Sequence, residues 1–297
     1  MSKTILIAGG TGLVGKEMTA YLKKAGHTVR ILTRGKTDLA KGYYHWNPSK
    51  DEIDPACFDQ TSVIINLAGA GIADKKWSAK RKQEIIDSRV IPALFLSRMA
   101  QEMKSLEHYI SASGINCYGY ASYDRLHEES DPFGADYLSQ VVRLWEDAAD
   151  TMQAHVKVAK IRISVVLTEK GGALPKIAGP IKNYIGAPLG SGKQWMPWIT
   201  LHDLIRLFEH VMNNKLEGAY NAVAENPTNK EFTQQLAKQL NKPLWLPPVP
   251  GFVLKLFLGE MSSVVLQGLQ ASNQKIVASG FNFNHATLEE ALASIYV

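Results

Sequence analysis

The stretch Ile5-Leu-Ile-Ala-Gly-Gly-Thr-Gly-Leu-Val-Gly15 decides the fold of this chain. A short apolar run ends in glycines, and apolar residues then recur at helical spacing, which predicts a strand, a tight turn and a helix. The glycines fit both a G-x-G-x-x-G and a G-x-x-G-x-x-G pattern, and either leaves a turn without Cβ atoms that a pyrophosphate can approach at a helix N-terminus. The stretch therefore predicts dinucleotide binding by consecutive residues, namely Gly9, Gly10, Thr11, Gly12, Leu13, Val14 and Gly15.

The end of the next predicted strand, residues 28–33, indicates which dinucleotide is bound. In a dinucleotide-binding βαβ unit, an acidic residue about 20 positions after the glycines holds the ribose hydroxyls of NAD, whereas an arginine suits the 2′-phosphate of NADP. This chain carries Thr33 and Arg34 at that point. We therefore expect both residues to contact the cofactor and expect NADP to be preferred over NAD.

Strands and helices alternate along the first half of the sequence. Further strands are predicted at residues 62–67, 108–113 and 156–167, and helices at 78–103 and 136–152, the first of them kinked or broken at Pro92. Such alternation predicts an α/β fold, a Rossmann-type doubly wound parallel sheet that binds ligands at the carboxyl ends of its strands. Residues predicted to meet the cofactor at these ends are Asn66, Leu67, Ala68, Gly69 and Ser111.

After Thr168 the pattern changes, because glycines and prolines punctuate short pieces of chain. We therefore expect a Rossmann NAD(P)-binding domain over residues 1–168 and a smaller α+β substrate-binding part over 169–297, in which a helix at 200–213 and a strand at 220–224 can pack back on the first domain. Aromatic and polar residues of this part form either a pocket wall or the core of a small subdomain. The candidates for substrate contacts are Gln194, Trp195 and Trp198 of this part, together with Tyr118 of the first domain.

The composition excludes several classes of function. With 45% hydrophobic residues the 297-residue chain can bury a proper core, and its net charge of +5 comes from 33 basic and 28 acidic residues that are interspersed, so no nucleic-acid partner is expected. Two distant cysteines suit a reducing compartment, and the most apolar C-terminal run, residues 252–269, carries Lys255 and Glu260. We expect a cytoplasmic protein without a membrane partner. Eight histidines without ligand spacing predict no metal site.

Several motifs together resemble a known superfamily. Gly9 to Gly15, Asn66-Leu67-Ala68-Gly69, Ser111-Ala112-Ser113 and Arg162 are similar to the extended short-chain dehydrogenase/reductases, the NAD(P)-dependent epimerases and dehydratases. Ser88-Arg89, Trp145-Glu146 and residues 190–199 resemble its atypical "epimerase family protein" subgroup, which carries a C-terminal domain of unknown function. The resemblance spans essentially the whole chain. It implies nucleotide binding, adds Arg89 as a cofactor contact, and implies a homodimer through the helices at 78–103 and 136–152, but it leaves the reaction open.

The catalytic motif of the superfamily is incomplete in this chain. In the superfamily a tyrosine acts as acid or base, a lysine four residues later lowers its pKa, and a serine orients the substrate; an unassisted phenol titrates near pH ~10. None of the 11 tyrosines has a lysine at that spacing. The best match is Tyr137, followed by Val141, and Ser113 matches the serine. Ser113 and Tyr137 are therefore the predicted catalytic pair, in a degenerate motif.

Three interpretations stay open at this point. Tyr137 still transfers a proton if another cation reaches it, the candidates being Lys160, Arg143 and Lys176. A different acid serves instead, the candidates being Tyr118, Tyr123 and Glu146. Alternatively the chain is a catalytically silent sensor that binds NADP and acts through a partner. The leading hypothesis is an NADP-binding oxidoreductase or nucleoside-sugar-epimerase-like enzyme that acts on an unknown small molecule.

Overall fold

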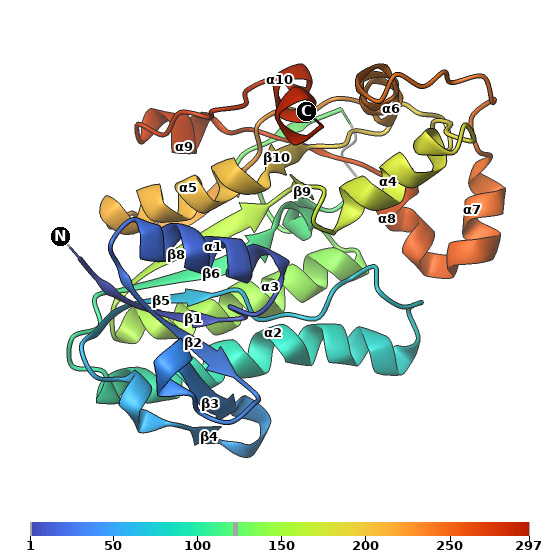
Figure 1. Ribbon diagram of the computed structural model, residues 1–297. Coiled ribbons are helices and arrows are strands. Elements are labelled where there is room, and N and C mark those ends of the chain that lie inside the picture. Colours follow the sequence, from blue (N-terminus) through green and yellow to red (C-terminus); the bar gives the residue numbers. More distant parts are fainter. Residues whose placement is uncertain (1, 121–123, 297) are drawn as a thin grey trace.

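A computed structural model describes residues 2–120 and 124–296 and contains an eight-stranded sheet in the order β11-β8-β6-β5-β1-β2-β3-β4 (Figure 1). Neighbouring strands of the sheet run parallel except for β3 and β4. The predicted Rossmann-type parallel sheet is thereby confirmed. Its strands are β1 (Thr4–Ala8), β2 (Thr28–Thr33), β3 (Tyr43–Asn47), β4 (Glu52–Ile53), β5 (Thr61–Asn66), β6 (His108–Gly114), β8 (Lys157–Ile163) and β11 (Gly218–Ala222).

Helices cover both faces of this sheet. Helices α1 (Leu13–Lys24) and α5 (Leu201–Asn213) lie on one face, and α2 (Ala79–Met99) and α3 (Tyr137–Asp150) on the other (Figure 1). Because side chains alternate along a strand, Ile5 and Ile7 of β1 pack into the core beneath α1 and α5, whereas Leu6 and Ala8 pack into the core beneath α2. This double burial explains why β1 reads as an unbroken apolar run.

Pro92 does not break its helix, and one predicted strand is divided in two. Helix α2 runs through Pro92 to Met99 without a break, because Phe95 and Leu96 beyond the proline are fully buried against the sheet and hold the helix in register. The single strand expected at 156–167 is instead two strands, since the chain turns at Ser164 after β8 and continues as β9 (Val165–Leu167). The Ser164 hydroxyl donates to the Ala222 carbonyl at 2.7 Å, and β9 pairs with β10 (Trp198–Thr200) outside the main sheet.

The rest of the chain after residue 168 forms a smaller, mainly helical part. Its own core surrounds Trp198 and is built from α4 (Ala173–Lys182), α6 (Asn229–Gln239) and α10 (Leu288–Ile295). Helices α6 and α10 begin with the capping boxes that Thr228 with Glu231 and Thr287 with Glu290 predict. Shorter elements are α7 (Gly251–Leu258), α8 (Ser263–Leu266), α9 (Gln274–Ala278), and the paired strands β7 (Leu126–His127) and β12 (Gln270–Ala271).

The segment from α5 to β11 returns to the central sheet. Thr200 caps α5 by accepting a hydrogen bond from the Asp203 amide at 3.1 Å, and β11 then pairs in parallel with β8. The carboxyl ends of the parallel strands consequently meet at one end of the molecule, on the right in Figure 1, next to α7 and α8. Among the helices of the described residues, none combines the length and the apolar character that crossing a membrane requires.

Candidate functional site

The turn after β1 has the geometry that an anion requires. Gly9 adopts a φ of +79°, and its carbonyl accepts a hydrogen bond from the Gly12 amide at 3.0 Å. A Cβ atom on Gly15 would lie 2.3 Å from the Gly9 oxygen, so only glycine fits where helix and turn pack together. Gly12 is the N-cap of α1 without a side-chain cap, and the first turn of α1 carries no acidic residue. The helix therefore presents free amides and positive dipole charge to a ligand.

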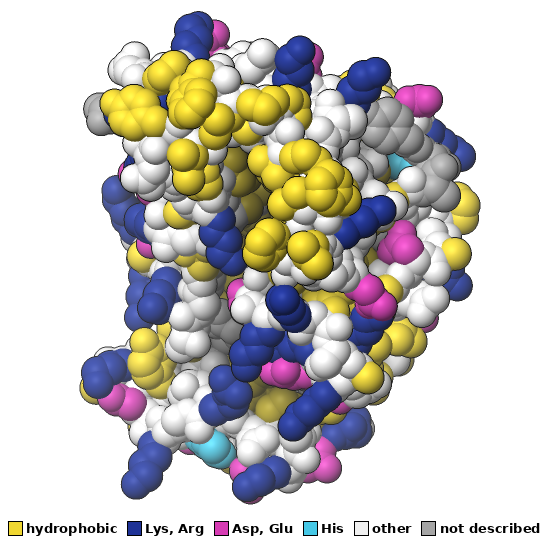
Figure 2. Space-filling model, turned by 90° about the vertical axis from the view of Figure 1, so that its right-hand side faces the viewer, with side chains coloured by type: hydrophobic (Ala, Val, Ile, Leu, Met, Phe, Trp, Pro, Cys, Tyr) yellow, Lys and Arg dark blue, Asp and Glu magenta, His cyan; other side chains and the backbone are white. Residues whose placement is uncertain are grey.

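A cavity of about 1030 Å³, the cofactor cavity below, lies beyond this turn at the carboxyl ends of β1, β2, β3 and β5. Figure 2 looks onto this end of the sheet and shows the face hollowed. The predicted cofactor residues that line the cavity are Gly9, Thr11, Gly12, Thr33, Arg34, Leu67, Ala68 and Gly69. Residues 46–49 and one side of α2, including Ser88, complete the walls. Its volume is at the upper end of the range for small-molecule and cofactor sites.

Other predicted cofactor residues support the walls from behind. Asn66 is fully buried; its amide nitrogen donates to the Tyr109 hydroxyl at 2.8 Å, and its oxygen accepts from the Ala68 amide at 3.1 Å, which fixes the loop after β5. The Ser111 hydroxyl is buried and donates to the Ala112 carbonyl at 2.9 Å. Six predicted cofactor residues line neither this cavity nor the smaller one that adjoins it: Gly10, Leu13, Val14, Gly15, Asn66 and Ser111.

Arg34 stands at the open end of β2, exposed and facing the cofactor cavity. Within residues 2–120 and 124–296 the structure gives its guanidinium no carboxylate partner, and the strand end itself, from Thr33 to Lys36, has no acidic residue. A fixed positive charge at the rim therefore remains available for an anionic group of a ligand.

A second cavity of about 310 Å³, the substrate cavity below, adjoins the first. Arg89 lies at the border: it lines the substrate cavity, and its guanidinium carbon would be 3.2 Å from a Cβ on Gly69 of the cofactor cavity. Ser113 lines the substrate cavity from β6 and Trp195 from the C-terminal part. Most of the remaining wall is apolar and includes Leu138, Val141, Val142 and Trp145 of α3, together with Met196, Pro197, Val264 and Leu269.

Ser113 belongs to a buried polar network. Its hydroxyl donates to Glu146 Oε1 at 2.6 Å, and Arg162 binds the same carboxylate through Nε at 2.8 Å and Nη2 at 3.0 Å. Burial raises the pKa of Glu146, but the hydrogen bonds and charge of Arg162 outweigh that effect and hold the pKa below its ordinary value. Because the hydroxyl proton of Ser113 is committed to an ionised carboxylate, the oxygen can only accept hydrogen bonds from a donor in the cavity.

Tyr118 is part of this network and not of the cavity wall. Its hydroxyl donates to Asn221 Oδ1 at 2.7 Å and accepts from Arg162 Nη1 at 3.0 Å, and burial raises its pKa. Gln194 is likewise buried, and its amide donates to the carbonyls of Leu189 and Val265, both at 2.9 Å. Trp198 is fully buried in the core of the C-terminal part. Of the four predicted substrate contacts, only Trp195 lines the substrate cavity.

The structure does not bring Tyr137 to Ser113. The Tyr137 hydroxyl donates to the Lys82 carbonyl at 3.0 Å, its ring packs 5.0 Å from that of Trp77, and it lines neither cavity. The cation beside it is Lys82, with Nζ 5.0 Å from the ring centroid. The cations that the sequence suggested lie elsewhere: Lys160 binds Asp150 at 2.7 Å, Arg143 lies over Phe133, and Lys176 is exposed on α4. The alternative acid Tyr123 falls outside the described residues.

From the sequence, Glu146 was named through the resemblance and as an alternative acid, and Arg162 only through the resemblance. A signal was present, since Arg162 lies between Ile161 and Ile163 at the apolar carboxyl end of the strand. An arginine in such a strand is buried and must find an anion, because an unpaired buried charge is costly. The partner, however, lies 16 residues earlier on a different element, so the pairing follows only from the fold.

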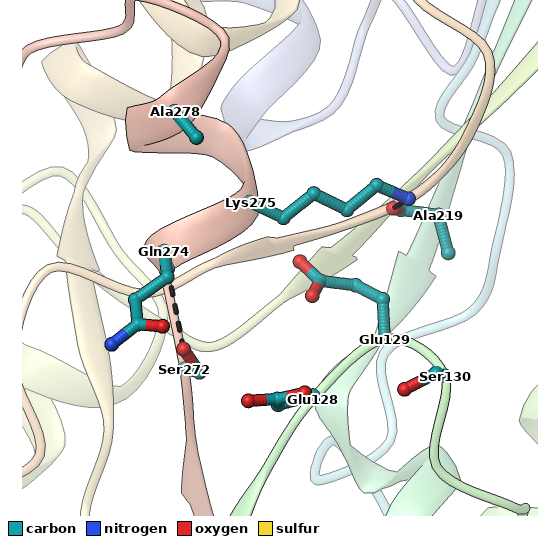
Figure 3. Close-up of a pocket in the computed structure, with 8 residues that line it drawn as sticks. All are labelled: Glu128, Glu129, Ser130, Ala219, Ser272, Gln274, Lys275 and Ala278. Atoms are coloured by element: carbon teal, nitrogen blue, oxygen red, sulfur yellow. Dashed lines mark hydrogen bonds between the residues drawn. The ribbon is translucent and has the colours of Figure 1, made fainter.

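A third cavity, of about 500 Å³, lies at the edge of the sheet beside β11 (Figure 3). Lys275 reaches across it and donates to the Ala219 carbonyl at 2.8 Å, and Glu129 Oε1 accepts from the Asn221 amide at 2.8 Å. Both charged side chains thus satisfy backbone groups that a further strand would otherwise pair. We therefore interpret Lys275 and Glu129 as a cover for the edge of the sheet, and not this cavity as a site of reaction.

Comparison with known proteins agrees with this geometry. Residues 5–223 match the NAD dependent epimerase/dehydratase family, and residues 249–295 match a domain of unknown function. The epimerase family protein YfhF of Bacillus subtilis is 34% identical over 298 residues, covering 98% of this chain and 97% of YfhF. A chloroplastic epimerase family protein SDR39U1 homolog of Arabidopsis thaliana is 34% identical over 304 residues, covering 98% of this chain and 86% of its own length.

Solved structures show the same similarity over the whole chain. The human epimerase family protein SDR39U1, crystallised with NADPH, has a TM-score of 0.87 at 26% identity and covers 99% of both chains. A nucleoside-diphosphate sugar epimerase from Corynebacterium glutamicum has a TM-score of 0.82 at 26% identity, with 100% of this chain and 58% of that one covered. The glycine turn, the cavity beyond it and these matches together lead to one conclusion: the chain belongs to the NAD-dependent epimerase/dehydratase family.

Proposed function

We propose that the protein is an NADP(H)-dependent oxidoreductase of this family that acts on a small, largely apolar molecule. The observation that carries the proposal is Arg34, a cation at the rim of the cofactor cavity on a strand end without a carboxylate. An acidic residue there would repel the 2′-phosphate of NADP, whereas arginine can bind it through paired hydrogen bonds. The NADPH in the crystals of the related human protein supports the same assignment.

The larger cavity would bind the cofactor and the smaller one the substrate. The glycine turn and the start of α1 would bind the pyrophosphate, and Arg34 the 2′-phosphate. Bound NADP(H) supplies or accepts a hydride. In the adjoining cavity Ser113 would accept a hydrogen bond from the hydroxyl of an alcohol, the reduced form of a ketone or quinone, and Glu146 would hold the serine in that orientation.

The wall of the substrate cavity favours an oxidoreductase acting on a small molecule over an epimerase acting on a nucleoside sugar. A sugar joined to a nucleoside diphosphate carries many hydroxyl and phosphate groups that all need partners when they are buried. The described wall offers few polar side chains, namely Arg89, Ser113, Asn116, Tyr120, Ser164 and Gln267. A compact molecule with one or two oxygen atoms matches this set better.

The cofactor assignment is tested by binding. We expect NADPH to bind more tightly than NADH, and Arg34→Ala to weaken NADPH by roughly ten- to a hundredfold while leaving NADH nearly unchanged. Isothermal titration calorimetry or protein fluorescence measures both affinities. The matched control is Arg98→Ala, because Arg98 is an exposed arginine that pairs with Asp51 and lines neither cavity. Equal affinities of the wild type for NADH and NADPH would show that the assignment is wrong.

One observation favours a second candidate, a catalytically silent NADP-binding protein. The face of α3 that lines the substrate cavity presents Leu138, Val141 and Val142, of which Val141 stands at the position of the superfamily's lysine, and the Tyr137 hydroxyl donates to Lys82 of α2. The two candidates are separated by hydride transfer: NADPH deuterated at nicotinamide C4 is offered a panel of aliphatic and aromatic ketones and quinones. Label in the product that disappears in Ser113→Ala, at unchanged NADPH affinity, supports the enzyme. Tight NADPH binding without transfer to any compound supports the silent protein.

A further inference from the structure

Exposed apolar side chains gather at one place on the molecule. Of the eleven large hydrophobic residues that are exposed among the described residues, six come from two short stretches. The stretches are connected, because Leu189 pairs with Val249 between them and the Gly190 amide donates to the Val249 carbonyl at 2.8 Å. Figure 2 shows apolar side chains spread over the upper half of this face. We call the six residues the apolar patch: Tyr184, Ile185, Trp245, Phe252, Leu256 and Phe257.

Helix α7, at the centre of the apolar patch, has no buried residue at all. Its sequence is Gly-Phe-Val-Leu-Lys-Leu-Phe-Leu, and the exposed fractions of Phe252 and Leu256 are 73% and 77%. From Gly259 to Gln267 only Ser262 is buried. A surface helix normally turns an apolar stripe to the core and a polar face to water, so a helix that is apolar nearly all round and still exposed indicates a surface that meets an apolar phase.

The charges around the apolar patch are positive. Lys255 is the one charged residue of α7 and is exposed. Lys242 donates to the Tyr184 hydroxyl at 2.7 Å, with its ammonium 4.1 Å from the ring centroid. The nearest acid in sequence, Glu260, is neutralised by an ion pair with Lys82. Lysines beside exposed aromatic rings complement anionic phosphates at a boundary between water and hydrocarbon.

We propose that the apolar patch docks the protein on an anionic lipid bilayer, with α7 lying in the plane of the membrane. A bilayer matches the composition better than a second protein does, because protein interfaces are depleted in lysine whereas interfacial membrane helices combine aromatic, aliphatic and basic residues. The proposed contact is peripheral, so no segment crosses the membrane. The proposal replaces the sequence-based expectation of no membrane partner, which considered only membrane-spanning segments. The docking does not depend on the cofactor assignment.

The place of the apolar patch in the fold gives this docking a consequence for the substrate. The segment that follows α7 forms part of the substrate cavity, since Val264, Gln267 and Leu269 line it together with Ser113. The membrane-facing segment and the cavity wall are therefore one continuous piece of chain. This consequence rests on the proposed function: an apolar substrate dissolved in the bilayer would lie next to the segment that forms this part of the cavity wall.

Vesicle flotation tests the docking directly. The full-length protein is mixed with vesicles of phosphatidylcholine containing phosphatidylglycerol, and we expect it to float with them. The triple variant Phe252→Ser, Leu256→Ser, Phe257→Ser should lose at least about tenfold in partition coefficient, and Lys255→Glu about tenfold at low salt. Leu39→Ser is the matched control, because Leu39 is 64% exposed, lies far from α7 in sequence and should change nothing.

Two further measurements make the result decisive. Thermal unfolding and NADPH affinity of the triple variant should equal those of the wild type, which shows that the variant is folded; if they do not, Lys255→Glu carries the test alone. Analytical ultracentrifugation of the wild type and the triple variant shows whether a second copy covers the apolar patch. A wild type that stays unbound with anionic vesicles, a triple variant that floats like the wild type, or a dimer that the triple variant dissociates would each overturn the proposal.

Discussion

The cofactor cavity and the substrate cavity share a border at Arg89 but are built in different ways. The first includes the glycines after β1 and the small residues after β5, all within the first 70 residues, where backbone lines the cavity. The second is made of side chains from β6, α3 and residues 195–197 and 264–269, which the fold brings together. A turn whose backbone lines a cavity accepts only glycine where atoms approach closely. Such a turn can therefore be recognised from a short stretch of sequence. A pocket made of distant side chains cannot.

The largest effect should come from the buried network behind the substrate cavity. Replacing Glu146 by leucine leaves the Arg162 guanidinium buried without its partner, and we expect a loss of about 3–5 kcal/mol in the free energy of unfolding. Chemical denaturation measures this loss. Glu107→Leu is the control, because the Glu107 pair with Lys215 is exposed and should matter far less. Similar losses in both variants would show that the network does not hold this cavity together.

The same network predicts a pH dependence. The pKa of Glu146 in the folded chain lies below its ordinary value of 4.5, so its stabilising contribution is present at neutral pH and is lost as the pH falls below that value. The difference in the free energy of unfolding between wild type and Glu146→Leu should therefore narrow on acidification. A difference that stays constant from neutral pH to the acid limit of folding would contradict the ionised state of Glu146.

The next effect tests the glycine turn. A methyl group on Gly15 would lie 2.3 Å from the Gly9 oxygen and 2.6 Å from the Gly10 Cα, both backbone atoms that cannot swing aside. Gly15→Ala should therefore cost roughly 3 kcal/mol in the free energy of unfolding and abolish NADPH binding. Gly179→Ala is the matched control: nothing lies within 4 Å of its added Cβ inside α4, so a slight gain of up to about 1 kcal/mol is expected. Normal NADPH binding by Gly15→Ala would show that the cofactor cavity does not depend on glycine in this turn.

The smallest effect concerns the residue that the sequence favoured as catalytic. Tyr137→Phe removes one hydrogen bond to the Lys82 carbonyl, so we expect a loss of about 1 kcal/mol or less in the free energy of unfolding. NADPH affinity and any hydride transfer found in the ketone and quinone panel should stay within about twofold of the wild type. A loss of transfer as large as that of Ser113→Ala would place Tyr137 in the reaction after all and restore the superfamily's acid.

The sequence predicted the central strands β1, β5 and β6, because they are buried on both faces and are bounded by turns, whereas it did not predict the short, partly buried β4. It also placed Arg34 at the cofactor cavity, since the distance from the glycines to the end of β2 is set by one helix and two short loops. It missed the turn at Ser164, whose hydroxyl bonds to a residue 58 positions later. The catalytic role of Tyr137 stays a prediction. The sequence did not show that its hydroxyl meets the Lys82 carbonyl, because spacing along a helix shows which residues share a face but not which neighbour that face meets.

The cover over β11 has a consequence for how the molecule can assemble. Lys275 and Glu129 occupy the hydrogen-bonding positions that an incoming strand would need, and at the opposite margin β4 is only two residues long. Neither margin offers a template on which another chain could add a strand, so the sheet resists edge-to-edge aggregation. We therefore expect any oligomer to form through surfaces other than these two margins, and a second copy competes with the bilayer only if it meets the apolar patch.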